Sequence, residues 1–158
     1  MNKNWKIIKK IKFKSSYDCL KELKKKRINV SVWIEDIIKV NKYSYSNIKF
    51  HVKLVRKFVK DFGFKGPTEL KKIYLKAEKF GLNLVPPEIA IYSRLIYNEQ
   101  PNGEWLRFAT PLNSMIDTDK VPHLPKLGKS LGLFFIETYW SYPKAIFHPH
   151  NEFVFLLK

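Results

Sequence analysis

Apolar residues in the first hundred positions of the chain recur at the three- and four-residue spacing of helices. Ser15 and Ser16 can cap a helix over residues 17–27, where Leu20 and Leu23 form a thin apolar stripe. An aspartate in the first turn of this segment suits the positive end of a helix. The pattern therefore predicts that the chain begins with helical structure.

Start signals indicate two further helices. Ser31 can cap a helix over residues 32–40, which has an acidic first turn. Pro86 and Pro87 are accepted in the first turn of a helix, and the apolar pattern after them runs to about Tyr97.

The most regular apolar pattern follows Ser46 and predicts one buried helical face. Its members are Ile48, Val52, Val55, Val59 and Phe62, separated by steps of four and three. After a break at Gly63, Gly66 and Pro67, Thr68 can cap another helix. The buried stripe of that helix is formed by Leu70, Ile73, Ala77 and Phe80.

Cationic side chains accompany these two apolar stripes at the same spacing, on an adjacent helical face. They are Lys49, Lys53, Arg56, Lys60, Lys71, Lys72, Lys76 and Lys79.

After residue 103 the pattern changes to short apolar and alternating runs that favour strands. Residues 104–110 alternate, with Trp105 and Arg107 on the face opposite Leu106 and Phe108. Residues 131–139 and 153–157 are rich in strand-forming residues. The run VPHLPKL at residues 121–127, which precedes them, is expected to be an edge strand, because its two prolines cannot donate to a central ladder.

These elements predict an α+β fold with N-terminal helices packed on a small C-terminal antiparallel sheet of three or four strands. We divide the chain into a helical part over residues 1–98 and a β part over residues 99–158. At 158 residues, the two parts are expected to share one core in a single compact domain.

The charge is distributed unevenly between the two parts. The net charge is +16, and residues 1–80 carry 23 Lys and Arg against 7 Asp and Glu, whereas residues 81–158 carry 7 of each kind. This asymmetry indicates a cationic lobe beside a neutral one.

The run LVRKFVKDFGFKGPTELKKIYLKAEKFGLNLVPPEIAIYSRLIYNEQPNGEWLRFATPL, at residues 54–112, resembles a family of uncharacterised small bacterial proteins. The similarity extends to SVWIEDII upstream and to the closing P-x-x-x-F-V-F, and it covers roughly three-quarters of the chain. The resemblance implies one intact domain. It implies no activity, substrate or catalytic residue.

The leading hypothesis is a non-catalytic module that binds the backbone of RNA or DNA through the eight cations named above. Clustered cations gain affinity for nucleic acid by releasing condensed counterions. The chain has 26 Lys and only 4 Arg, a bias that favours sequence-independent contacts over base readout. The alternative for the same residues is a solvated lysine face on a protein-interaction adaptor.

A small nuclease-like hydrolase is the second hypothesis. His148 and His150 in the run FHPHNEF can serve as acid and base, with Arg94 and Glu104 from the junction of the two parts. The same histidines, with Glu152, are the candidate metal ligands. The structural alternatives are a strand-entry turn for the histidines, and an ion pair in which Glu88 or Glu104 neutralises a buried arginine.

The remaining signals limit the class of protein. Cys19 is the lone cysteine and cannot form an internal disulfide, and no Cys and His cluster has structural-zinc spacing. No run approaches the roughly 18 apolar residues of a membrane span. We therefore expect a cytoplasmic protein without a cofactor or a membrane partner.

Overall fold

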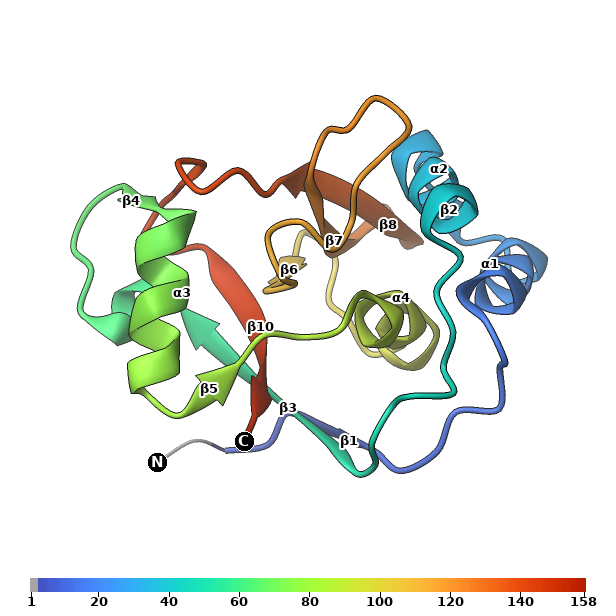
Figure 1. The fold of residues 1–158 in the computed structure, drawn as a ribbon, viewed down its shortest axis with the longest axis horizontal. Helices are drawn as coiled ribbons and strands as arrows, with labels where there is room; N and C mark the ends of the chain where they lie inside the picture. The colour runs from blue at the N-terminus through green and yellow to red at the C-terminus, as the bar shows by residue number, and fades with distance from the viewer. Residues whose placement is uncertain (1–2) are drawn as a thin grey trace.

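The computed structural model describes residues 3–158 (Figure 1). The helices are α1 (Ser16–Lys25), α2 (Val32–Asn41), α3 (Leu70–Lys79) and α4 (Pro87–Ile96), with a short 3-10 helix, η1 (Val59–Phe62). The strands are β1 (Lys6–Ile8), β2 (Asn29–Val30), β3 (Val52–Phe58), β4 (Thr68–Glu69), β5 (Leu82–Asn83), β6 (Trp105–Phe108), β7 (His123–Ser130), β8 (Leu133–Trp140), β9 (Ile146–Phe147) and β10 (Glu152–Leu157).

The sheet corrects the expected fold class. Instead of three or four antiparallel strands, the structure has an eight-stranded mixed sheet in the order β1-β3-β10-β6-β7-β8-β2, with β5 pairing beside the end of β10. The pairs β10–β6 and β2–β8 are parallel. Four of the strands come from the part of the chain that was expected to be helical. The fold is still α+β, but both parts of the chain build the same sheet.

Strand β3 replaces the helix expected after Ser46, and this expectation was wrong. Val52 and Leu54 are buried in the core on one face of the sheet, whereas Val55 is buried in the core on the other. A strand buried on both faces loses the simple alternation that identifies a strand in a sequence. The spacing from Ile48 to Phe62 therefore imitated a helical stripe.

Strand β7 was expected at an edge but lies between β6 and β8. Its Pro125 pairs with Thr138 of β8, whereas the pairing with β6 begins only at Lys126. The missing N–H of Pro125 therefore falls just beyond the end of the β6 ladder, where it removes no hydrogen bond.

The start signals of the helices agree better with the structure. The Ser15 side chain accepts a hydrogen bond from Asp18 N at 3.3 Å, and Ser31 accepts one from Ile34 N at 3.2 Å, so both predicted caps are confirmed. α4 begins with Pro87 in its first turn, as expected. Thr68 does not cap α3, because it pairs in β4 with Phe147 and its hydroxyl donates to Gly66 O.

Two apolar cores cover the two faces of the sheet. α1, α2 and α4 pack on one face in a core that includes Val154 of β10. α3 and η1 pack on the other face, against Phe153 and Phe155 of the same strand. Figure 1 shows α3 on one side of β3 and β10, with the other three helices on the opposite side.

A close contact on the sheet gives a test of the register of β6 and β7. Trp105 and Gly128 are paired, and a Cβ built on Gly128 would lie 2.4 Å from the Trp105 ring. Gly128→Ala is expected to lower the free energy of unfolding by about 1–3 kcal/mol in urea denaturation. Gly66→Ala, which meets no atom within 4 Å, is the control. An equal loss in a Trp105→Ala background would contradict the contact.

Candidate nucleic-acid interface

The eight predicted cations do not form the single helical stripe that their spacing suggested. Lys53 and Arg56 belong to a strand and project to opposite faces of the sheet. Lys53 projects to the same face as Val55, which is buried in the core under α3. The Lys53 side chain itself is exposed. Lys49 lies in the loop before β3, and Lys60 lies in η1; both are exposed.

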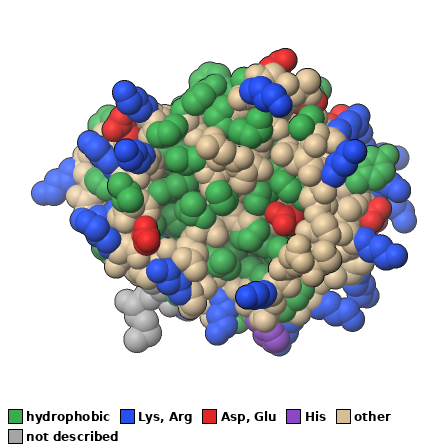
Figure 2. Space-filling model, viewed as in Figure 1, with side chains coloured by type: hydrophobic (Ala, Val, Ile, Leu, Met, Phe, Trp, Pro, Cys, Tyr) green, Lys and Arg blue, Asp and Glu red, His purple; other side chains and the backbone are tan. Residues whose placement is uncertain are grey.

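The four predicted lysines of α3 keep the arrangement expected of them. Lys71, Lys72 and Lys79 are exposed and Lys76 is half-buried. Among the described residues, the one ion pair that these lysines form joins Lys72 Nζ to Glu69 at 3.9 Å. Figure 2 shows basic side chains around the margin of one face of the molecule, with hydrophobic side chains over its middle. The excess of basic residues in the first 80 positions therefore does not form one continuous basic lobe on this face.

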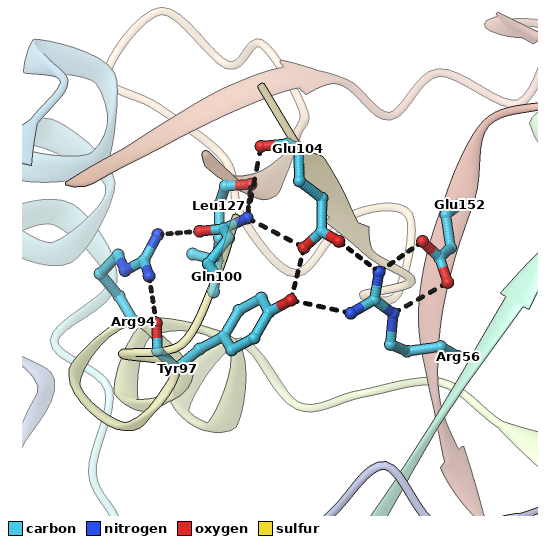
Figure 3. Close-up of polar contacts among 7 residues, drawn as sticks. All are labelled: Arg56, Arg94, Tyr97, Gln100, Glu104, Leu127 and Glu152. Atoms are coloured by element: carbon cyan, nitrogen blue, oxygen red, sulfur yellow. Dashed lines mark hydrogen bonds and ion pairs between the residues drawn. The ribbon is translucent and has the colours of Figure 1, made fainter. Parts of the chain in front are cut away.

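Arg56 is held by two carboxylates (Figure 3). Its guanidinium donates to both carboxylate oxygens of Glu152 at 2.8 and 2.5 Å, to Glu104 Oε2 at 2.8 Å and to Tyr97 Oη at 2.9 Å. Burial would lower the pKa of Arg56, but the hydrogen bonds and charges of Glu152 and Glu104 outweigh it and raise this pKa. Each nitrogen of the Arg56 guanidinium therefore has a partner. Arg56 is a structural cation, and we no longer count it among the predicted phosphate contacts.

The same network continues through Gln100 to Arg94. Tyr97 Oη donates to Glu104 Oε1 at 2.6 Å, and Gln100 Nε2 donates to the same oxygen at 3.3 Å (Figure 3). Gln100 Oε1 accepts from Arg94 Nη1 at 2.7 Å. The network thereby joins α4 to the segment before β6.

Arg94 is only 1% exposed, yet it has no direct carboxylate partner among the described residues. Its guanidinium donates to the backbone carbonyls of Tyr97, Gly128 and Phe135. Burial lowers its pKa to about 10. The ion pair of Arg94 with Glu88 or Glu104 considered from the sequence is replaced by carbonyl contacts. Glu104 is instead the partner of Arg56.

Two further cations, Arg107 and Lys126, lie on the side of the sheet that bears α3. Arg107 of β6 pairs with Phe153 of β10, which belongs to the core under α3. Arg107 also pairs with Lys126 of β7, and Lys126 pairs with Glu137 of β8. Paired residues on neighbouring strands project to the same face. The half-buried side chains of Arg107 and Lys126 therefore lie on one face of adjacent strands.

Arg107 is unlike Arg56 because no carboxylate binds it. Within residues 3–158, its guanidinium makes no ion pair, its buried Nε has no hydrogen-bond partner, and the Phe147 ring lies 5.8 Å from its Cζ. Burial lowers the pKa of Arg107. Burial and the charge of Arg107 lower the pKa of Lys126, although Glu137 acts in the opposite direction.

Aromatic side chains surround this pair of cations. Lys126 Nζ lies 5.0 Å from the centre of the Trp105 ring and 5.9 Å from that of Tyr139. Phe135 packs beside Trp105, with ring centres 6.1 Å apart. All three rings are half-buried and keep part of their surface open to solvent.

The residues of the hydrolase hypothesis do not meet in one site. His148 and His150 lie in the turn between β9 and β10, exposed, with their rings stacked 5.8 Å apart. Asn151 accepts a hydrogen bond from His148 N at 2.7 Å, as in a turn. Glu104 and Arg94 belong to the network of Figure 3 and make no contact with these histidines.

The candidate metal ligands are separated as well. Glu152 follows the histidines in sequence, but both of its carboxylate oxygens bind Arg56. Nowhere in residues 3–158 do three His, Cys, Asp or Glu side chains come together in a way that could hold a metal ion. Burial raises the pKa of Cys19 to about 12, which keeps its thiol protonated. Within the same residues no helix has the length and apolar character to cross a membrane.

No protein-family model, curated protein or solved structure matches the chain. The resemblance to an uncharacterised bacterial family therefore stays an expectation.

The sequence contained a partial signal for the pair Arg107 and Lys126. The alternation of residues 104–110 placed Arg107 opposite Leu106 and Phe108, which are buried in the core under α4. Nothing in the sequence placed Lys126 beside it, because VPHLPKL was expected at an edge. The pairing of β6 with β7 brings the two cations together.

Removing the shared cation of the network is expected to destabilise the fold. Arg56→Met leaves Glu104 and Glu152 facing each other, with side chains only 20% and 15% exposed. The free energy of unfolding should fall by about 3 kcal/mol in urea denaturation. Lys53→Met, at an exposed position of the same strand, should change it by less than about 0.5 kcal/mol. Equal effects of the two changes would argue against the network.

Proposed function

We propose that this protein is a non-catalytic module that binds the backbone of single-stranded RNA or DNA on the side of the sheet that bears α3. The observation that carries the proposal is the guanidinium of Arg107, which forms no ion pair within residues 3–158 and lies beside Lys126. Two neighbouring cations in a half-buried position are costly unless an anion accompanies them. The pKa values of Arg107 and Lys126 are both lowered, which means that burial disfavours their charged forms.

A phosphate group is the anion that suits this pair best. The planar fork of an arginine matches two phosphate oxygens, and a neighbouring lysine adds a second point charge. A bound phosphate would supply an acceptor for the unpartnered Nε of Arg107 and offset the repulsion between Arg107 and Lys126. It would also raise the pKa of both groups towards their ordinary values.

The exposed lysines extend the contact along a nucleic-acid backbone. Lys53 and the α3 lysines lie on the same side of the sheet as Arg107, and they supply sequence-independent affinity through counterion release. Lys49 and Lys60 flank the same strand, β3, and complete the set. Arg56 takes no part, because its donors bind carboxylates.

The aromatic rings around the cations favour a single strand over a duplex. Unpaired bases stack on aromatic side chains, whereas bases in a duplex are already stacked on one another. Trp105 and Tyr139 retain exposed surface next to Lys126, and the half-buried Phe135 packs beside Trp105. This combination of rings and cations supports a single-stranded partner.

Glu137 sets a limit on the affinity of this site. It pairs with Lys126 across β7 and β8, and its charge acts to raise the pKa of that lysine. Its negative charge repels a phosphate bound near Lys126. The proposed site therefore has a built-in repulsive element that a single substitution can remove.

The test measures binding by fluorescence anisotropy with labelled oligonucleotides of about 20 nucleotides, both single-stranded and duplex, over a range of salt concentrations. The single strand should bind more tightly, and its affinity should fall steeply as salt rises. Arg107→Gln and Lys126→Gln should each weaken binding by about tenfold, the value of one lost charge-assisted contact. Glu137→Gln should strengthen it by about threefold.

The control variant is Lys25→Gln, which removes an exposed lysine on α1, on the other side of the sheet. It should leave the affinity nearly unchanged. The proposal fails if the single strand does not bind at low salt. It also fails if Arg107→Gln and Lys25→Gln weaken binding to the same extent, since the contact would then be a diffuse effect of net charge.

A further inference from the structure

A pocket of about 390 Å³ lies at the end of β8, and Arg107 and Lys126 are not among its lining residues. It is bounded by the start of α2, by the loop before β7 and by the last residues of β8. Trp33 and Trp140 line it and are 48% and 57% exposed, respectively. Large aromatic side chains with this much open surface offer a ligand both apolar contact and a π face.

The charge of this pocket is opposite to that of the chain. Asp117, Asp119 and Glu137 line it, and no Lys or Arg is among its lining residues. The whole chain has 30 Lys and Arg against 14 Asp and Glu. A pocket with this lining is complementary to a cation, and it disfavours the polyanion proposed for the other site.

Hydrogen bonds hold one wall of the pocket in place. His123 Nε2 lies 2.9 Å from Asp117 Oδ2, and His123 Nδ1 lies 3.0 Å from Thr138 Oγ1. Asp117 Oδ1 accepts from the backbone N–H groups of Asp119 and Val121. The Trp33 ring stacks on His123 with ring centres 5.7 Å apart. The aromatic wall is thus fixed before any ligand arrives.

The outer edge of β8 is open beside this pocket. The parallel partner β2 ends at Val30, and Ser31 N donates to Ile136 O before the chain turns into α2. No strand within residues 3–158 pairs with the outer edge of Glu137–Trp140. By alternation, the backbone groups of Thr138 and Trp140 face the same outer side as Ile136 O.

This edge lacks two of the features that keep an edge strand from pairing. β8 contains no lysine and no proline, the residues that most often protect such edges. The opposite edge of the sheet, at β1, has Lys6 within the strand and Lys9 and Lys10 directly after it. The contrast marks β8 as the edge that can accept another strand.

We propose that an extended peptide segment of a partner protein adds to the outer edge of β8 at Thr138–Trp140 and places a lysine or arginine side chain in the adjacent pocket. Main-chain hydrogen bonds would give affinity, and the pocket would give specificity. The apolar stem of the side chain would lie on Trp33 and Trp140, and its charge would meet Asp119.

A second copy of the chain is a poorer occupant of this edge. Antiparallel pairing of two β8 edges would bring Asp119 and Glu137 of one copy close to the same carboxylates of the other. Like charges brought together at an interface suppress that association. A peptide with a basic residue avoids this repulsion.

The test is isothermal titration calorimetry with a five-residue, acetylated and amidated peptide of β-branched residues around a central arginine. The peptide should bind, and versions with central glutamate or norleucine should bind at least about tenfold more weakly. Trp33→Ala and Asp119→Asn should each weaken binding of the arginine peptide by about fivefold or more. Glu78→Gln removes an exposed carboxylate of α3 and should have no effect.

Hydrogen exchange of the backbone amides decides between the occupants. Bound peptide should protect the amides of Thr138 and Trp140 from exchange. The proposal is overturned if the arginine and glutamate peptides bind equally or not at all. It is also overturned if arginine amide alone binds as tightly without protecting these amides, which would show a small-cation pocket. Protection that rises with protein concentration and without peptide would show a second copy at the edge, and would equally overturn it.

Discussion

The fold depends on one guanidinium shared by two carboxylates. Arg56 of β3 binds Glu152 of β10 and Glu104 before β6, and it also donates to Tyr97 after α4. Three strands and a helix that are distant in sequence meet at this half-buried point. Bidentate geometry and a full set of partners are the conditions under which a buried charge is tolerated, and they specify how the elements are arranged.

The arginines on the two faces of the sheet have different partners. On the face covered by α4, Arg56 is neutralised by carboxylates, and Arg94 is surrounded by carbonyl oxygens. On the face that bears α3, Arg107 has neither, and it lies next to Lys126. The same residue type is therefore structural on one face and available to an external anion on the other. This difference depends on which strands are neighbours, and no count of charges reveals it.

The molecule also separates its charges in space. The lysines and the pair Arg107 and Lys126 make the α3 side of the sheet cationic, whereas the pocket at the edge of β8 is lined by Asp117, Asp119 and Glu137. Glu137 lies between the two regions, because it lines the pocket and pairs with Lys126. Ligands of opposite charge bound at the two places would therefore be coupled through this one carboxylate.

The sequence by itself determined the α+β class and the four helices. The local start signals at Ser15, Ser31 and Pro87 placed α1, α2 and α4, and an apolar stripe placed α3. The sequence also placed Arg107 on the face opposite Leu106. The tertiary structure decided the rest, since β3 is buried on both faces and has no alternation, and since the neighbours of a strand are chosen by long-range pairing. Strand geometry places Lys53 and Arg56 on opposite faces of the sheet, and strand order places Arg107 beside Lys126. No local pattern in the chain encodes either arrangement.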